Sequence, residues 1–182
     1  LKRYLIVGVV LLAFGFNFTV AGSALKLNSS CGLKEMATGD QKLSLVSEDG
    51  GFFAYDVKNQ KDIDLSKGSM EESENKTTYT SDVSGGLKLH AEFTPERDYI
   101  LVKGHLENLN KDDRAIILDY RVNLPGKNKV FSNALSESDD LVITDDGDEQ
   151  EGSAFPMAAL YTDNSAIAMA IPPYEPRSFG MV

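Results

Sequence analysis

Residues 86–124 carry the pattern that most constrains the fold, because apolar and polar side chains alternate there through three segments. A period of two places successive side chains on opposite faces of a β-strand, so each segment predicts a strand with one buried and one solvated face. Polar turns at 94–97 and 109–112 separate the segments and are short enough for hairpins. We therefore predict an antiparallel meander. Its expected core residues are Leu89, Val102, Ile116, Leu118, Tyr120 and Val122.

Short strands are expected in the rest of the chain as well. Residues 41–58 predict a hairpin around a glycine turn at 48–51, and the glycines at 85–86 predict a turn into the meander. The polar stretch 62–75 predicts a surface loop or an irregular edge. Further strands are expected at 77–80, 141–144, 155–162, 165–171 and from 178 onward, with the weakest pattern at 129–140.

The fold class follows from the number of these strands. No segment keeps a helical period beyond one or two turns. About ten short strands in one domain predict an all-β fold, an antiparallel β-sandwich of the supersandwich-like kind. The last expected strand begins at Ser178 and the sequence stops at Val182, so we expect this domain, residues 41–182, to continue in a longer protein.

The N-terminus has the composition of a signal peptide. Lys2 and Arg3 precede an apolar run over 4–20, and small residues follow at 21–24. We predict a signal peptide over 1–24, cleaved after Ser23 or Ala24, then an N-terminal lead over 25–40. An uncleaved anchor is the alternative, but the run is shorter than the roughly 20 residues that span a bilayer. The mature protein is then secreted, periplasmic or on the cell surface, with no membrane attachment.

The net charge limits the possible binding partners, and the cysteine content limits the possible disulfides. The formal net charge is -10, which disfavours binding to nucleic acid or to an anionic membrane surface. Cys31 is the one cysteine, so no internal disulfide can form, and we expect a free thiol in a loosely ordered lead.

Two groups of residues are candidate metal ligands. His90 and His105 fall on the polar faces of strands expected to be neighbours, but the sequence places no third ligand, so exposed strand histidines are the favoured interpretation. An acidic segment over 139–151 offers clustered oxygen ligands of the kind calcium prefers, although its spacing matches no calcium loop and a solvated loop is favoured. Its acids are Asp139, Asp140, Asp145, Asp146, Asp148, Glu149 and Glu151.

Catalytic and sugar-binding signals are few. No spacing singles out a pair of carboxylates for glycoside hydrolysis, and no phosphate, dinucleotide or nucleophile-elbow motif occurs, so we assign no catalytic residue and no cofactor. Tyr99 is the best candidate for stacking on a sugar. Asp113 is expected to accept backbone N–H bonds at a turn, and Arg114 to pair with a carboxylate across the strands, which makes this segment structural.

Several short sequence motifs in residues 86–182 resemble those of a known protein family. The motifs are Lys103-Gly104-His105-Leu106-Glu107-Asn108, Asp113-Arg114-Ala115-Ile116, Leu124-Pro125, Phe155-Pro156-Met157, the run 166–172 and Pro176-Arg177-Ser178-Phe179. Their order and spacing resemble the N-terminal galactose-mutarotase-like β-sandwich of large secreted glycoside-hydrolase-like proteins. The resemblance implies that a (β/α)8 barrel, absent from this chain, would follow and carry any catalysis. The tryptophan-containing stretch that this family has after Leu-Pro is replaced here by residues 126–129.

Two functions are consistent with these observations. The first is a non-catalytic β-sandwich module of an exported carbohydrate-active protein, in contact with carbohydrate through a downstream catalytic domain. The alternative is a surface structural or adhesion module of an exported multidomain protein. An independent enzyme is disfavoured because no acid–base or nucleophile set can be named.

Overall fold

Antiparallel strands make up all the regular secondary structure in the described part of the chain, which contains no helix. The computed structural model describes residues 4–13, 24–38, 41–96, 99–126, 129–131, 137–138, 157–162 and 165–170. This confirms the predicted all-β class. Within those residues, no helix is long and apolar enough to cross a bilayer.

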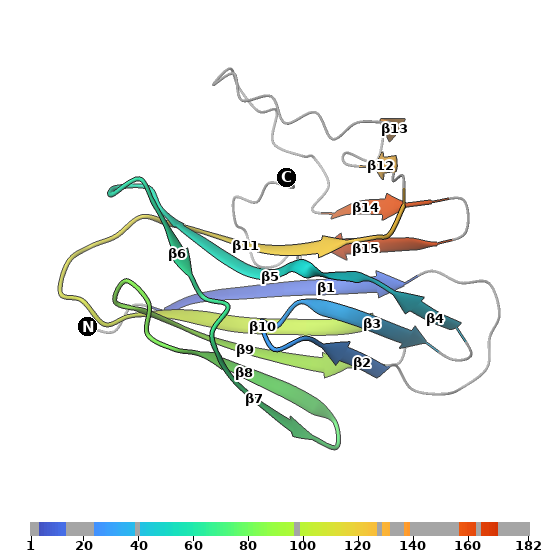
Figure 1. Ribbon diagram of the computed structural model, residues 1–182, viewed down its shortest axis with the longest axis horizontal. Coiled ribbons are helices and arrows are strands. Elements are labelled where there is room, and N and C mark those ends of the chain that lie inside the picture. Colours follow the sequence, from blue (N-terminus) through green and yellow to red (C-terminus); the bar gives the residue numbers. More distant parts are fainter. Residues whose placement is uncertain are drawn as a thin grey trace.

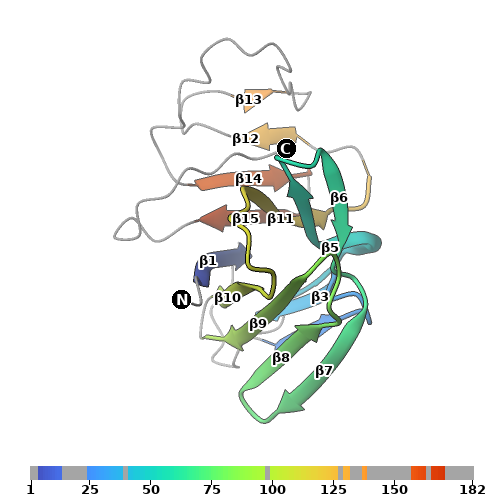
Figure 2. The same cartoon turned by 90° about the vertical axis from the view of Figure 1, so that its left-hand side faces the viewer.

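The described strands form three sheets (Figure 1). The nine-stranded sheet has the order β13 (Glu137–Ser138), β12 (Lys129–Phe131), β14 (Met157–Tyr161), β15 (Ala166–Ala170), β1 (Tyr4–Ala13), β10 (Tyr99–Asn108), β9 (Leu87–Pro95), β8 (Lys76–Ser81) and β7 (Gly68–Ser73). The two three-stranded sheets have the orders β11 (Ile116–Asn123), β5 (Val46–Asp56), β6 (Lys61–Asp64) and β2 (Ala24–Leu27), β3 (Leu33–Thr38), β4 (Gln41–Ser44). Figure 2 shows the large sheet twisting across its width, as neighbouring strands do.

The β9–β10 hairpin is the centre of the core, and the alternating pattern predicts it correctly. The two strands pair antiparallel, with Leu106 opposite Leu89 and Val102 opposite Phe93. All four side chains are buried, whereas the intervening positions of β9 are half-buried. The apolar face of this hairpin therefore points inward along its whole length, as a period-two pattern requires.

The predicted pairing of the third strand of the meander is wrong. β11 pairs with β5 rather than with β10, and Tyr120 lies opposite Phe52. Residues 109–115 carry the chain from the large sheet to this small one. The apolar face of β11 then meets the large sheet, where the Phe93 ring lies 5.9 Å from that of Tyr120 and 6.3 Å from that of Phe52. Alternation fixes which face of a strand is apolar, but not which strand lies beside it.

The predicted core is confirmed for three of its six members. Leu89, Val102 and Val122 are buried. The other three, Ile116, Leu118 and Tyr120, are partly buried and pack against the core from the small sheet.

The expected glycine turn at 48–51 is also wrong, because this segment lies inside β5. Gly51 has a φ of 116°, and a Cβ there would lie 2.6 Å from the backbone oxygen of Ser30. The glycine is therefore needed where the 28–32 loop crosses β5, rather than for a reversal of the chain. The turn predicted at 85–86 is confirmed, since Gly85 and Gly86 both have positive φ.

Residues 24–38 have regular secondary structure, which contradicts the loosely ordered surroundings expected for Cys31. They form β2 and β3, and the loop between them is closed by Asn28, whose Oδ1 accepts the N–H groups of Ser30 at 2.9 Å and Gly32 at 2.7 Å. Cys31 is buried, and burial raises the pKa of its thiol far above the ordinary value. Such a thiol is inert, since the thiolate is the reactive form.

The N-terminal segment 4–13 forms β1, between β10 and β15. Cleavage of the signal peptide over 1–24 stays a prediction, as do the boundaries of the lead and of the following domain. The expected strands at 77–80 and 165–171 are confirmed as β8 and β15, and β14 forms within 155–162. The strands expected at 141–144 and from 178 onward lie outside the described residues.

Two leucines of contrasting burial test this core. Leu89 is 0% exposed, so we expect Leu89→Ala to lower the free energy of unfolding by about 2–5 kcal/mol, through lost burial and the cavity left behind. Leu109 is 48% exposed, and Leu109→Ala should stay within about 0.5 kcal/mol of wild type. Chemical denaturation of both variants measures the difference. Equal losses would contradict the assignment of Leu89 to the core.

Candidate functional site

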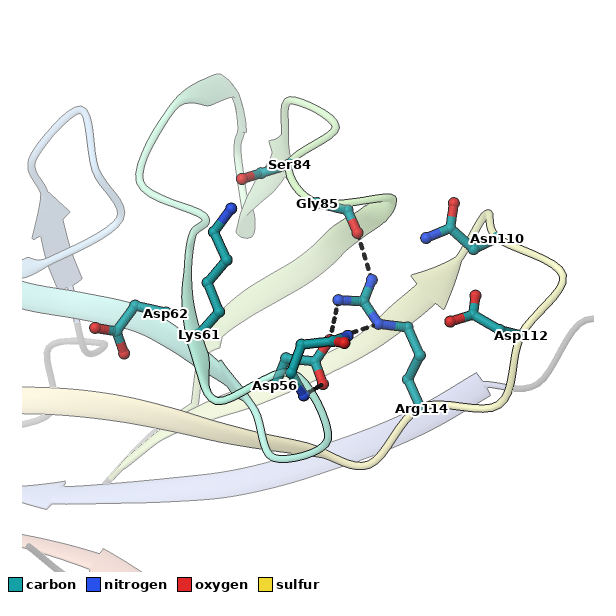
Figure 3. A pocket seen from close by; sticks show the side chains of 9 residues that line it. Asp56, Lys61, Asp62, Ser84, Gly85, Asn110, Asp112 and Arg114 are labelled. Atoms are coloured by element: carbon teal, nitrogen blue, oxygen red, sulfur yellow. Dashed lines mark hydrogen bonds and ion pairs between the residues drawn. The ribbon is translucent and has the colours of Figure 1, made fainter.

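A polar cleft of about 310 Å³ opens at one end of the small sheet formed by β11, β5 and β6 (Figure 3). Three segments far apart in sequence meet there: the turn between β5 and β6, the turn before β9, and residues 109–115 that lead to β11. The lining residues are Asp56, Asn59, Lys61, Asp62, Ser84, Gly85, Asn110, Asp112 and Arg114.

The floor of the cleft is an ion pair between Asp56 and Arg114. Both side chains are nearly inaccessible, at 1% and 7% exposure. The Arg114 Nε donates to Asp56 Oδ2 at 2.9 Å, and its Nη2 donates to the same oxygen. Asn59 completes the site, since its backbone N–H donates to Asp56 Oδ1 at 3.1 Å and its side-chain amide donates to Oδ2 at 2.8 Å. Asp56 is thus buried with both oxygens occupied, as a buried carboxylate must be.

Arg114 also holds the turn before β9. This turn is closed by reciprocal backbone bonds between Ser84 and Leu87, at 3.0 and 2.9 Å. It leaves the Gly85 carbonyl directed at Arg114, whose Nη1 donates to it. One guanidinium therefore ties the end of β5 to the start of β9.

This arrangement keeps Asp56 ionised. The hydrogen bonds from Arg114, followed by those from the Asn59 side chain, lower the Asp56 pKa from 3.8 to about 2, against the opposing effect of burial. A general acid needs the reverse, a carboxyl pKa raised toward neutrality. Asp56 is therefore a structural anion and not a proton donor.

The remaining carboxylates do not form a catalytic pair with it. Asp62 and Asp112 are exposed and lie on opposite sides of the Arg114–Asp56 pair in Figure 3. Lys61, Ser84 and Asn110 add an ammonium group, a hydroxyl and an amide to the walls. The cleft thus offers hydrogen-bond donors and acceptors, and no side chain from the apolar core lines it.

Sequence reasoning predicted part of this site. It gave Arg114 a structural role with a carboxylate across the strands, which is confirmed, and Asp113 beside it is exposed. It missed Asp56, which lies 58 residues away and belongs to a strand that was expected in a hairpin. The available signal is an acid directly after the continuous apolar and aromatic run over 52–55.

The predicted histidine pair is brought together. His90 and His105 lie opposite each other on β9 and β10, and their rings stack with centroids 4.7 Å apart. Tyr99 is half-buried at the start of β10. The acidic segment 139–151 lies outside the described residues. Among the residues that are described, no three His, Cys, Asp or Glu side chains converge as they would around a bound metal ion.

Comparisons with models of known protein families, with curated proteins and with solved structures found no match to this chain.

Removing the Arg114 side chain should destabilise the protein strongly. Arg114→Met leaves a buried carboxylate without its cation, and we expect Tm to fall by roughly 6 °C or more. The matched control is Arg121→Met, because that guanidinium is exposed and lies 4.0 Å from the centroid of the Phe53 ring. The control should shift Tm by no more than about 2 °C. Equal shifts in the two variants would show that the buried pair does not anchor the cleft.

Low pH should weaken the ion pair between Asp56 and Arg114. The folded-state pKa of Asp56 lies below its ordinary value, so its stabilising effect is complete above pH 3.8 and is lost as the pH falls toward about 2. Thermal unfolding at several pH values between 6 and 2 should show Tm falling across this window. Asp56→Asn removes the titrating group, so its Tm should depend less on pH there than that of wild type. Identical pH profiles would contradict the assignment.

Proposed function

We propose that the chain is a non-catalytic β-sandwich module of an exported carbohydrate-active protein, and that its polar cleft contacts sugar hydroxyls. The observation that carries this proposal is the composition of the cleft. Every side chain that lines it is polar or charged, and donors and acceptors are mixed. A ligand that matches such walls must itself present many groups that both donate and accept hydrogen bonds, as sugars do.

Charge and size narrow the ligand further. The lining holds three carboxylates against two cations, and one carboxylate is neutralised by Arg114. Two free acids and one free lysine disfavour an anionic ligand. A volume of about 310 Å³ is at the small end of the range for ligand sites, which suits one or two sugar units.

The sandwich architecture is part of the proposal. Phe52 and Tyr120 of a small sheet contact Phe93 of the large sheet, and packing of two apolar sheet faces is the stabilising principle of a β-sandwich. The resemblance of residues 86–182 to the N-terminal domain of glycoside-hydrolase-like proteins favours the same arrangement. In that arrangement a downstream barrel would supply catalysis, and the cleft would hold or flank the sugar chain.

The proposal that the module is non-catalytic rests on the ionisation and solvent exposure of the carboxylates in the cleft. Glycoside hydrolysis needs a protonated carboxyl facing a second carboxylate about 5–10 Å away in a site that excludes water. In this cleft the buried carboxylate is held ionised by Arg114, and the other two are exposed to water. The alternative function, a structural or adhesion module, would need no such cleft.

The test measures binding and turnover on the full chain. We expect retardation in affinity electrophoresis by at least one polysaccharide of a broad panel, and no hydrolysis of aryl-glycosides. Asp112→Asn should weaken binding about tenfold, the effect of losing a charged hydrogen bond. The matched control, Asp119→Asn, changes an acid of β11 that does not line the cleft and should bind like wild type.

Three results would reject this function. Absence of binding to every polysaccharide would favour the structural or adhesion module. Equal binding by Asp112→Asn and Asp119→Asn would place the sugar elsewhere. Turnover that disappears when one acid is replaced would make the chain itself an enzyme.

A further inference from the structure

The solvent face of the β9–β10 hairpin carries a preformed pair of imidazoles. His90 and His105 are directly opposite in the strand register, with ring centroids 4.7 Å apart and ring planes inclined by 19°. Their neighbours Leu89 and Leu106 are buried, so both histidines point away from the core. Both belong to regular strands rather than to loops, which restricts where their Cβ atoms can lie.

Two further side chains lie close to the ring nitrogens of His90. The Thr80 hydroxyl on β8 lies 3.3 Å from His90 Nδ1, within hydrogen-bond distance. Glu107, two residues beyond His105 on β10, places Oε2 4.0 Å from His90 Nε2. The Glu107 side chain is only 15% exposed, and that of His90 is 32% exposed. A partner on one ring nitrogen orients the imidazole and leaves the other nitrogen, here Nε2, for a metal ion.

Each lysine on the outer face of this hairpin lies opposite a carboxylate. Lys88 lies opposite Glu107 in the register, and Lys103 lies opposite Glu92, which also pairs with Lys76 at 2.7 Å.

We propose that His90 and His105 together bind a divalent first-row transition metal ion, with copper(II) held more tightly than nickel(II) or zinc(II). The order follows the general ranking of these ions for imidazole ligands. In the structure the rings stack, and a metal requires them to turn about χ2 until one nitrogen of each faces the ion. Cross-strand Cβ atoms about 4.5–5.5 Å apart permit this, because metal–nitrogen bonds are about 2.0–2.1 Å long.

Glu107 and Thr80 support the two ligands in this site. The Glu107 carboxylate brings negative charge to within 4.0 Å of His90 Nε2 and can accept a hydrogen bond from a metal-bound water. Thr80 fixes which His90 nitrogen is available. Water completes the coordination, so the site is open and exchangeable rather than a closed structural centre. This site is separate from the polar cleft and does not depend on the proposed sugar binding.

The experiment uses the fact that the chain contains two histidines and no others. The full chain is titrated with CuCl2 in a non-coordinating buffer at pH 7, followed by calorimetry and by pulsed electron paramagnetic resonance, which counts the imidazoles bound to copper(II). We expect one ion per chain with two imidazoles, so both His90 and His105 must be ligands. His90→Asn and His105→Asn should each leave one imidazole and weaken binding, and Thr80→Val should weaken it about tenfold.

The matched control is Lys103→Gln, which changes a solvent-exposed neighbour of His105 on the same strand face and removes no ligand. Its spectrum should match that of wild type. A wild-type spectrum with fewer than two imidazoles overturns the proposal without any variant, so a variant that fails to fold does not prevent a decision. Equal affinity of wild type and the double variant His90→Asn/His105→Asn would also overturn it.

Discussion

The buried pair of Arg114 and Asp56 is the interaction on which the connection between two sheets depends. The chain leaves the large sheet at the end of β10 and joins the small one at β11, and Arg114 lies just before that strand. A charge buried without its partner costs several kcal/mol, so the chain has few alternative ways to place this segment. A buried ion pair adds little net stability compared with apolar residues of similar size. Its main contribution is therefore to specify one arrangement of the segments that it joins.

The cleft follows from this requirement. To satisfy one guanidinium and one carboxylate, the fold brings together the end of β5, the turn before β9 and the segment before β11. These segments are turns, whose exposed side chains are polar because turn residues hydrogen-bond their own backbone. A concave polar surface around a rigid floor is the result. Any ligand would therefore meet walls positioned by an interaction that it does not itself disturb.

The sequence predicted strand faces well and strand partners less well. Alternation identified the buried side of β9 and β10 because a period of two is a local property of the chain. It could not place β11 beside β5, since pairing depends on contacts between distant residues. The same limit applies to the site: Arg114 signals a missing carboxylate, but nothing local to Asp56 shows that the two meet. In the sequence Gly51 indicates a turn, whereas the structure shows that a glycine is required there by the close approach of the Ser30 backbone, which is visible only in three dimensions.

The core also determines the geometry of the histidine pair on the opposite face. A register slip of one residue between β9 and β10 would expose the Leu89 and Phe93 side chains to solvent. It would also separate His90 from His105. Burial of the large apolar side chains therefore holds the two imidazoles opposite each other, although neither imidazole belongs to the core. Two ligands fixed by a well-buried hairpin lose little conformational entropy when an ion binds. For this reason a site with only two protein ligands can be expected on this sheet face, where the same two residues on a mobile loop would not suffice.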